Sequence, residues 1–386
     1  MQKSKLFLLT LSHFCVDTYA TLLAPLLPFM MVTFGLNLAS AGFLVTFYSV
    51  TSLSQPFMGV WGDRMQRRRL VIGGLILASV LPLMGVAGSY PILLVILFVG
   101  GLGVAAFHPQ VFSLAGELSQ PRRSFGISLF VFGGTLGIGL TPWWVPFFAD
   151  RLGLHWLPVF MPLGVIFALL LKRLVPLDNP QASAQMQSLR QVLHGRVRPL
   201  VLVTTVAFLR TVAAMGVAIF LPILAAERGY GSAHVGIPLG VFNLAGVCGS
   251  LLAGYLADRY HAKPLVWSTI LLSGPILIAA LYTEGLTHYA LLALGGGLVL
   301  CSNPLTISMA QEIAPRNSGL ASSLTLGLSW SLASLTFGPI GYVADLVGIV
   351  PTLAGVACLT LPAGLLALFL PSTHKQLQSE TEVSRA

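Results

Sequence analysis

The sequence predicts an all-α integral membrane protein with twelve transmembrane helices, arranged as two parallel six-helix repeats around a central cavity. Three observations predict this fold: the composition, the spacing of apolar stretches and an internal repeat. Of the 386 residues, 55% are hydrophobic and only 9% are charged. A soluble domain carries roughly 25% charged residues. The composition therefore excludes a soluble enzyme, a nucleic-acid-binding protein and a disordered chain, and it favours a chain embedded in a bilayer.

Apolar stretches long enough to cross a membrane recur along the chain. About 20 helical residues span the hydrocarbon core, and lipid offers no partners for the backbone groups of a more open structure. The first stretch contains Ser12, His13 and Asp17 and has no small-residue cleavage site after it, so we expect it to remain as a span. The predicted spans are 6–34, 39–61, 70–89, 91–114, 123–148, 155–175, 199–225, 233–256, 264–283, 287–312, 318–341 and 349–370.

The basic residues predict the orientation. If the N-terminus lies in the cytoplasm, 18 of the 21 Lys and Arg residues fall on that side, whereas Arg151 and Arg228 lie opposite and Arg210 lies within a span. The positive-inside rule then predicts a multi-pass membrane protein with both termini in the cytoplasm. Topology accounts for the formal net charge of +9, so we expect no nucleic-acid partner.

The chain matches itself at an offset of 195 residues. We therefore predict an N-terminal six-helix half over 1–175, a cytoplasmic linker over 176–198, a C-terminal half over 199–370 and a cytoplasmic tail over 371–386. Two such repeats are an architecture that supports alternating access. The matched pairs include Gly59 with Gly254, Gly100-Gly101 with Gly295-Gly296, His108-Pro109 with Asn303-Pro304, and Glu117 with Glu312.

The loop after the second span reads Gly-x-x-x-Asp-Arg-x-x-Arg-Arg over residues 59–68. With the twelve spans and the duplication, it resembles the signature of the major facilitator superfamily. Other motifs of the N-terminal half resemble the bacterial fosmidomycin-resistance group of drug exporters: Ser12-His13-Phe14-x-x-Asp17-x-Tyr19, Pro25-Leu-Leu-Pro28, Ser54-Gln55-Pro56, Phe107-His108-Pro109-Gln110 and the Gly-rich run 128–137. The resemblance implies this fold and secondary active transport.

The charged loop predicts a cytoplasmic latch, by which we mean charged residues that stabilise one conformer and release in the other. A glycine there permits close helix packing, an aspartate accepts from a helix N-terminus, and an arginine pairs with an acidic partner. A charge cluster that only sets topology is the alternative. The predicted latch residues are Gly59, Asp63, Arg64, Arg67, Arg68, Glu117, Asp258, Arg259 and Glu312.

The fifth span combines Gly133, Gly134 and Gly137 with Pro142. Small residues let two helices approach closely, and the proline bends the outer half of the span. The run resembles the exporter-associated motif of the superfamily, and a small-residue packing face with no influence on direction is the alternative.

Two charged residues lie well inside spans, Asp17 in the first and Arg210 in the seventh. Each costs roughly 2.5–3.5 kcal/mol at a helix centre on insertion scales, so each is expected to face protein or a water-filled cavity. The resemblance places both helices around the cavity. An interaction across the cavity and a structural pair that only holds the halves in register both remain open.

Histidines accompany the buried carboxylate. His13 lies four residues before Asp17 on the same helical face, and His108 precedes Pro109, where helical bonding is broken. We predict that Asp17, His13 and His108 couple protons, with hydrogen-bonded packing histidines as the alternative. The predicted solute-binding residues are Arg210, Tyr48, Gln55, Gln110, Asn243 and Asn303.

These expectations define a proton-coupled transporter that exports small drug-like or amphipathic compounds, with a proton-coupled or passive importer of a small organic nutrient as the alternative. Paired catalytic carboxylates, clustered metal ligands and nucleophile constellations are absent from the sequence pattern, so we expect no enzyme activity, no cofactor and no metal. The expected partners are the solute, protons and the lipid bilayer, and we expect a monomer. Substrate identity, direction of transport and coupling sign stay open.

Overall fold

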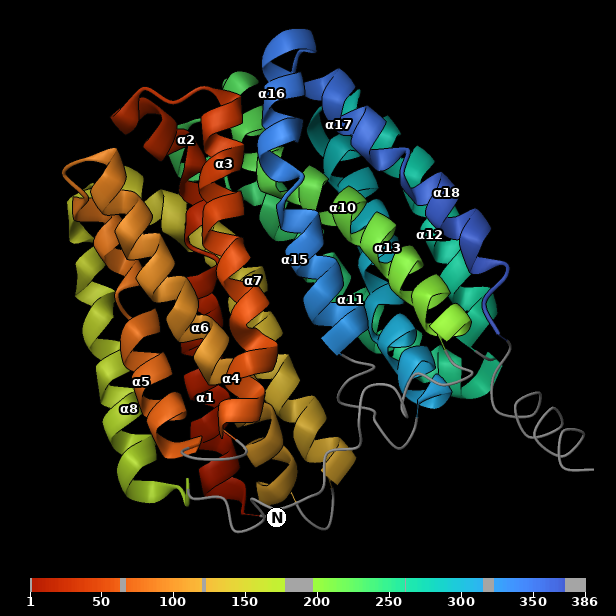
Figure 1. The fold of residues 1–386 in the computed structure, drawn as a ribbon. Helices are drawn as coiled ribbons and strands as arrows, with labels where there is room; N and C mark the ends of the chain where they lie inside the picture. Colours follow the sequence, from red (N-terminus) through yellow and green to blue (C-terminus); the bar gives the residue numbers. More distant parts are fainter. Residues whose placement is uncertain are drawn as a thin grey trace, which may run out of the picture. The chain divides into compact units, whose positions relative to one another are not determined.

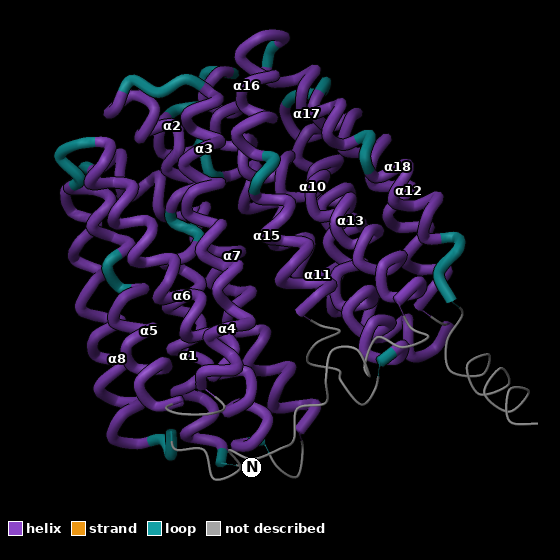
Figure 2. The backbone as a smooth tube through the Cα atoms, viewed as in Figure 1, coloured by secondary structure: helices purple, strands orange, loops and turns teal. Residues whose placement is uncertain are grey.

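The computed structural model describes residues 2–62, 67–119, 123–177, 197–260, 262–314 and 323–371. Every regular element in these ranges is helical, as the purple tube of Figure 2 shows. Up to residue 174 the helices are α1 (Lys3–Ala20), α2 (Leu23–Phe34), α3 (Leu38–Ser49), η1 (Val50–Ser54), α4 (Gln55–Trp61), α5 (Arg67–Ala78), η3 (Leu81–Val86), α6 (Tyr90–Leu118), α7 (Arg123–Leu152), η4 (Leu154–Phe160) and α8 (Met161–Leu174).

The remaining helices begin after the linker. They are α10 (Val197–Glu227), η5 (Ser232–His234), α11 (Ile237–Tyr260), α12 (Ala262–Leu281), α13 (Gly285–Ile313), η7 (Ser323–Leu328), α15 (Ser329–Ser334), α16 (Phe337–Val347), α17 (Ile349–Ala357) and α18 (Thr360–Ala367) (Figure 1). Of the short elements, η7 is a π-helix, whereas η1, η3, η4 and η5 are 3-10 turns.

Ten helical segments of the described chain are long and apolar enough to cross a membrane. The two other predicted spans differ for separate reasons. Span 39–61 is helical, but the Ser- and Thr-containing 3-10 turn η1 divides it into α3 and α4. Span 318–341 begins outside the described residues. The predicted all-α membrane fold is confirmed.

Contacts divide the chain into two compact units. Unit 1 comprises Met1–Ala184 with Leu221–Gly240, and unit 2 comprises Gln185–Phe220 with Val241–Ala386. Residues 221–240, which belong to the predicted C-terminal half, group by contacts with unit 1. In unit 1, η5 contacts α7, and a Cβ at Gly236 would collide with the carbonyl of Pro142.

Helix α1 occupies the interior of unit 1, where it contacts α5, α6, α7 and α8. Glycines of α7 make the closest of these approaches possible. A Cβ at Gly133 would collide with the side chain of Thr10, and a Cβ at Gly137 would lie 2.7 Å from the carbonyl oxygen of Phe14. The small residues on α7 therefore let its backbone lie directly against α1.

Unit 2 is built around α12, which contacts α13, α17 and α18. Its buried core includes Val266 and Ile270 of α12 with Leu305 and Met309 of α13. Side chains of these lengths interdigitate between helices and exclude lipid from the seam.

The internal repeat is visible in the packing of each unit. In unit 1, added Cβ atoms at Gly100 and Gly101 would collide with Leu81 and with Thr51 beside the Tyr48 carbonyl. In unit 2, the offset partners Gly295 and Gly296 lie in the same way against Leu277 and Phe242. The chain therefore repeats its helix contacts as well as its residues.

Candidate functional site

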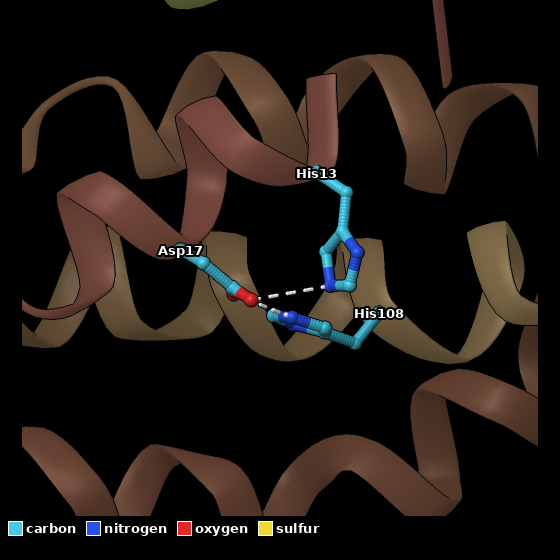
Figure 3. A group of neighbouring side chains, drawn as sticks. All are labelled: His13, Asp17 and His108. Carbon is cyan, nitrogen blue, oxygen red and sulfur yellow. Dashed lines mark hydrogen bonds and ion pairs between the residues drawn. The ribbon is translucent and has the colours of Figure 1, made fainter. Parts of the chain in front are cut away.

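Three predicted proton-coupling residues meet inside unit 1. Asp17 Oδ1 lies 2.9 Å from Nε2 of His108, and Asp17 Oδ2 lies 3.3 Å from Nε2 of His13. Figure 3 shows both imidazole rings directed at the carboxylate of Asp17. The ring of His13 comes from α1, the helix that also carries Asp17, and the ring of His108 comes from α6. Asp17 is 7% exposed and His13 is 3% exposed, so the contacts are largely shielded from solvent. We call these three residues the acidic cluster.

Both rings of the acidic cluster are anchored through Nδ1. His13 Nδ1 lies 3.0 Å from the carbonyl oxygen of Phe130, and His108 Nδ1 lies 2.9 Å from that of Val104. A carbonyl oxygen only accepts hydrogen bonds, so each Nδ1 carries the hydrogen. In a neutral ring Nε2 is then an acceptor, and here it faces a carboxylate oxygen that also accepts when ionised.

The contacts of Asp17 therefore have a fixed proton requirement. Neutral rings beside an ionised carboxylate give a net charge of −1 and leave acceptors facing each other. One added proton makes the 2.9 Å contact of His108 with Asp17 a hydrogen bond and the cluster neutral. A second proton does the same for His13 and gives a net charge of +1. The geometry is thus suited to holding and releasing protons.

The three residues also form the one group of potential metal ligands that the described residues bring together, with ligand atoms within 4.8 Å of one another. A divalent cation would satisfy the same atoms as the added protons. Because one proton already explains the hydrogen-bond length at His108, the geometry requires no ion. The absence of a metal stays a prediction.

Packing holds the acidic cluster in place. The ring of His13 stacks on Phe130, with centroids 4.2 Å apart and planes 10° from parallel, and Phe112 meets it edge-on. On the facing helix, a Cβ at Gly134 would collide with Asp17 Oδ2 and with the His13 ring. The predicted packing glycine therefore leaves the space that the carboxylate and imidazole occupy.

Arg210 lies in unit 2, in α10, and is 2% exposed. Its Nη2 donates to Oγ1 of Thr211 at 2.9 Å and to Oδ1 of Asn303 in α13 at 3.0 Å. Its Nε is buried without a hydrogen-bond partner among the described residues. The structure thus joins two predicted solute-binding residues, Arg210 and Asn303, and we call them with Thr211 the basic cluster.

The other predicted solute-binding residues are spread more widely. Tyr48 in α3 is half-buried, and its carbonyl accepts from the hydroxyl of Thr51 at 2.7 Å. Gln110 is buried and donates from Nε2 to the carbonyl of Met58 at 2.9 Å, so it connects α6 to α4. Gln55 in α4 and Asn243 in α11 are half-buried. A role for these residues in solute binding stays a prediction.

The predicted latch is only partly described. Arg67, with a buried side chain, forms two hydrogen bonds of 2.9 and 2.8 Å with the half-exposed carboxylate of Glu117. This bidentate pair joins α5 to α6 within unit 1. Arg68 is exposed, and Glu312 lies 3.5 Å from the hydroxyl of Ser308.

The remaining latch residues add one correction. A Cβ at Gly59 would lie 3.6 Å from Pro109, an ordinary contact, so the packing does not require glycine there. The close approach falls instead at Gly62, where a Cβ would collide with the Gln110 amide. Asp63 and Arg64 lie outside the described residues, and so do the side chains of Asp258 and Arg259.

Sequence reasoning missed three parts of the site. The Phe130 carbonyl that anchors His13 carries no signal in a side-chain pattern. Thr211 was overlooked beside Arg210, although adjacency alone could have suggested it. The pairing of Arg67 with Glu117 spans 50 residues, which is too far apart in the sequence for a helical spacing to indicate it.

Comparison with known proteins shows which family and which relatives this chain is similar to. The sequence model of the Major Facilitator Superfamily matches residues 9–339. The chain is 27% identical to the uncharacterized MFS-type transporter YfnC of Bacillus subtilis (strain 168), over 96% of this chain and 93% of that protein. It is 24% identical to the fosmidomycin resistance protein of Escherichia coli (strain K12), over 95% of this chain and 93% of that protein. A solved D-xylose-proton symporter shares the fold, with a TM-score of 0.76 and 18% identity over 96% of this chain and 98% of that one.

Proposed function

We propose, from the premise that this chain belongs to the Major Facilitator Superfamily, that it couples proton movement to the export of small drug-like or amphipathic compounds. Membership makes the chain a multi-pass membrane protein and a secondary transporter. Proton coupling, the export direction and the solute class are the proposal. The bacterial inner membrane, with both termini in the cytoplasm, is the proposed location.

The observation that carries the proposal is the acidic cluster. Its two rings are fixed as Nδ1–H tautomers, so the contacts of Asp17 change from repulsive to attractive when protons are added. Uptake or release of a proton changes the net charge of this buried cluster without the binding of any other ion. Conformers that expose the cluster to opposite sides of the membrane would take up and release protons on different sides.

Export is supported by the resemblance to the fosmidomycin resistance protein over nearly the full length of both chains. The Gly-rich face of α7 also supports export, because it resembles the exporter-associated motif of the superfamily. This face lies directly against α1, the helix that carries Asp17. A shift of α7 on α1 would therefore reach the acidic cluster without an intermediate element.

The test uses purified full-length protein in proteoliposomes with an imposed pH gradient and a panel of solutes that includes fosmidomycin. We expect gradient-driven movement of at least one solute in the wild type. Asp17→Asn keeps the size of the side chain but removes the exchangeable charge, so it should lose gradient-driven transport and keep solute exchange. The matched control is Asp150→Asn, at an exposed position near the end of α7, which should behave as wild type.

Direction is tested in cells. Expression in a fosmidomycin-sensitive bacterium should raise the tolerated drug concentration if the chain exports the compound. Increased sensitivity would favour the import alternative. Gradient-driven transport at the wild-type rate in Asp17→Asn would remove the acidic cluster from the mechanism.

A further inference from the structure

The charge of Arg210 has no carboxylate partner among the described residues. Its guanidinium is buried, and its side-chain bonds go to a hydroxyl and an amide oxygen, which are both neutral. In the C-terminal half, the acidic residues before the tail are Glu227, Asp258, Glu284, Glu312 and Asp345, and they lie at or near helix ends. A buried arginine without a counter-charge is unfavourable, so the site is incomplete as it stands.

The buried acid of unit 1 is already engaged. Both carboxylate oxygens of Asp17 contact histidines of their own unit. The contacts of Asp17 are therefore accounted for without Arg210, which weakens the alternative of a structural pair between these two residues.

The basic cluster has unused hydrogen-bond donors beside a positive charge. Arg210 Nε–H has no partner among the described residues. Thr211 and Asn303 accept from Arg210 through Oγ1 and Oδ1, so the hydroxyl and amide hydrogens remain available to donate. Free donors beside a buried guanidinium suit an anion, and the positive charge disfavours a cation.

We propose that the basic cluster binds an anionic group of the transported solute, a carboxylate or a phosphate-type oxyanion. This inference rests on the proposed transport function and names its substrate class. A guanidinium forms two parallel hydrogen bonds with such a group, and a fixed positive charge in a water-poor site strengthens them. Because Arg210 is buried, the anion has to enter in a conformer that opens the cluster, which alternating access provides.

The test compares the binding of benzoate, benzamide and benzylamine, which share one ring and are anionic, neutral and cationic at neutral pH. Binding is measured on purified full-length protein in lipid nanodiscs without a pH gradient. We expect the wild type to bind benzoate about tenfold to a hundredfold more tightly than benzamide, and benzylamine most weakly.

Variants assign the preference to the guanidinium. Arg210→Gln should abolish the benzoate-to-benzamide preference, and Arg210→Lys should retain part of it because it keeps the charge and loses the planar fork. Arg198→Gln, at the exposed start of the same helix, is the matched control and should keep the full preference. A purely structural role of Arg210 would not change the ratio of the benzoate affinity to the benzamide affinity.

The outcomes separate the two proposals. Equal binding of benzoate and benzamide by the wild type, or an unchanged preference in Arg210→Gln, would overturn the anion site while gradient-driven transport could still be observed. Recovery of the preference in the double variant Asp17→Asn with Arg210→Gln would also overturn it, in favour of the structural pair. If the wild type shows no gradient-driven transport of any solute in the panel, the proposed function is overturned, whatever the binding result.

Discussion

The two repeats place a polar contact between equivalent helices but fill it with different chemistry. In unit 1 the contact joins Asp17 of α1 to His108 of α6, and in unit 2 it joins Arg210 of α10 to Asn303 of α13. His108 and Asn303 are partners at the repeat offset, and each precedes a proline inside its helix. The repeat has thus kept the position of the contact and changed what it can do.

The difference concerns exchangeable charge. An aspartate with two histidines can exchange protons, whereas an arginine with an amide keeps its charge. One unit therefore carries a variable charge and the other a permanent one. We interpret the division as separate sites for the proton and the solute, and four predictions test it.

The largest effect is expected from His108→Asn, which gives unit 1 the residue that unit 2 has at this position. Asparagine keeps a hydrogen bond to Asp17 but cannot take up a proton, so gradient-driven transport should fall by about 100-fold. Proteoliposome flux under a pH gradient measures it, with His155→Asn at an exposed position as control. A wild-type flux would show that His13 and Asp17 suffice.

The second effect comes from Asn303→Asp, which supplies Arg210 with an internal counter-charge at nearly constant side-chain size. Affinity for benzoate should fall by about tenfold, and the midpoint of thermal unfolding should rise because a buried charge becomes paired. Asn37→Asp is the matched control, since aspartate also caps the start of α3. Tighter benzoate binding in Asn303→Asp would contradict the anion site.

A smaller effect is expected from Gly134→Ala, because the added methyl group meets Asp17 and His13. Overpacking of this kind destabilises a protein by about 1–3 kcal/mol, and displacement of the carboxylate should slow proton-driven transport several-fold. Unfolding midpoint and flux are measured together. Gly73→Ala in α5 has open space around its Cβ and should leave both unchanged, so equal behaviour of the two variants would count against the crowding explanation.

The smallest expected effect is none. If the acidic cluster works with protons alone, dialysis against a chelator should leave gradient-driven transport unchanged. Flux before dialysis, after dialysis and after addition of Zn²⁺ is compared on one preparation. Loss on chelation with recovery on Zn²⁺ addition would assign a metal to His13, Asp17 and His108.

Much of the fold follows from the sequence because lipid forces backbone groups to bond within each segment. Hydropathy therefore locates helices, and the repeat offset predicts which glycines make equivalent contacts. The limits appear where a local exception interrupts the rule. The 3-10 turn at Val50–Ser54 divides an apolar stretch that reads as one span, and residues 221–240 pack with the unit that precedes them in the chain.

Site residues were predictable from their spacing along a helix or from the free-energy cost of placing a charge inside a span. His13 and Asp17 share a helical face by their spacing, and a mid-span charge identifies Arg210 by its cost alone. The partner of a side chain on another helix is less accessible to this reasoning. Arg67 pairs with Glu117 across two helices, and Gly62 rather than Gly59 makes the close approach, and neither contact can be read from spacing along one helix.

The anchoring of His13 links its chemistry to the position of a helix. Its Nδ1–H is held by a carbonyl of α7, whereas its Nε2 faces a carboxylate of α1. If α7 slides along α1 by a fraction of a turn, the ring loses that acceptor and can carry its hydrogen on Nε2 instead. A neutral His13 would then donate to Asp17 without any added proton, so helix register would set how many protons the cluster needs.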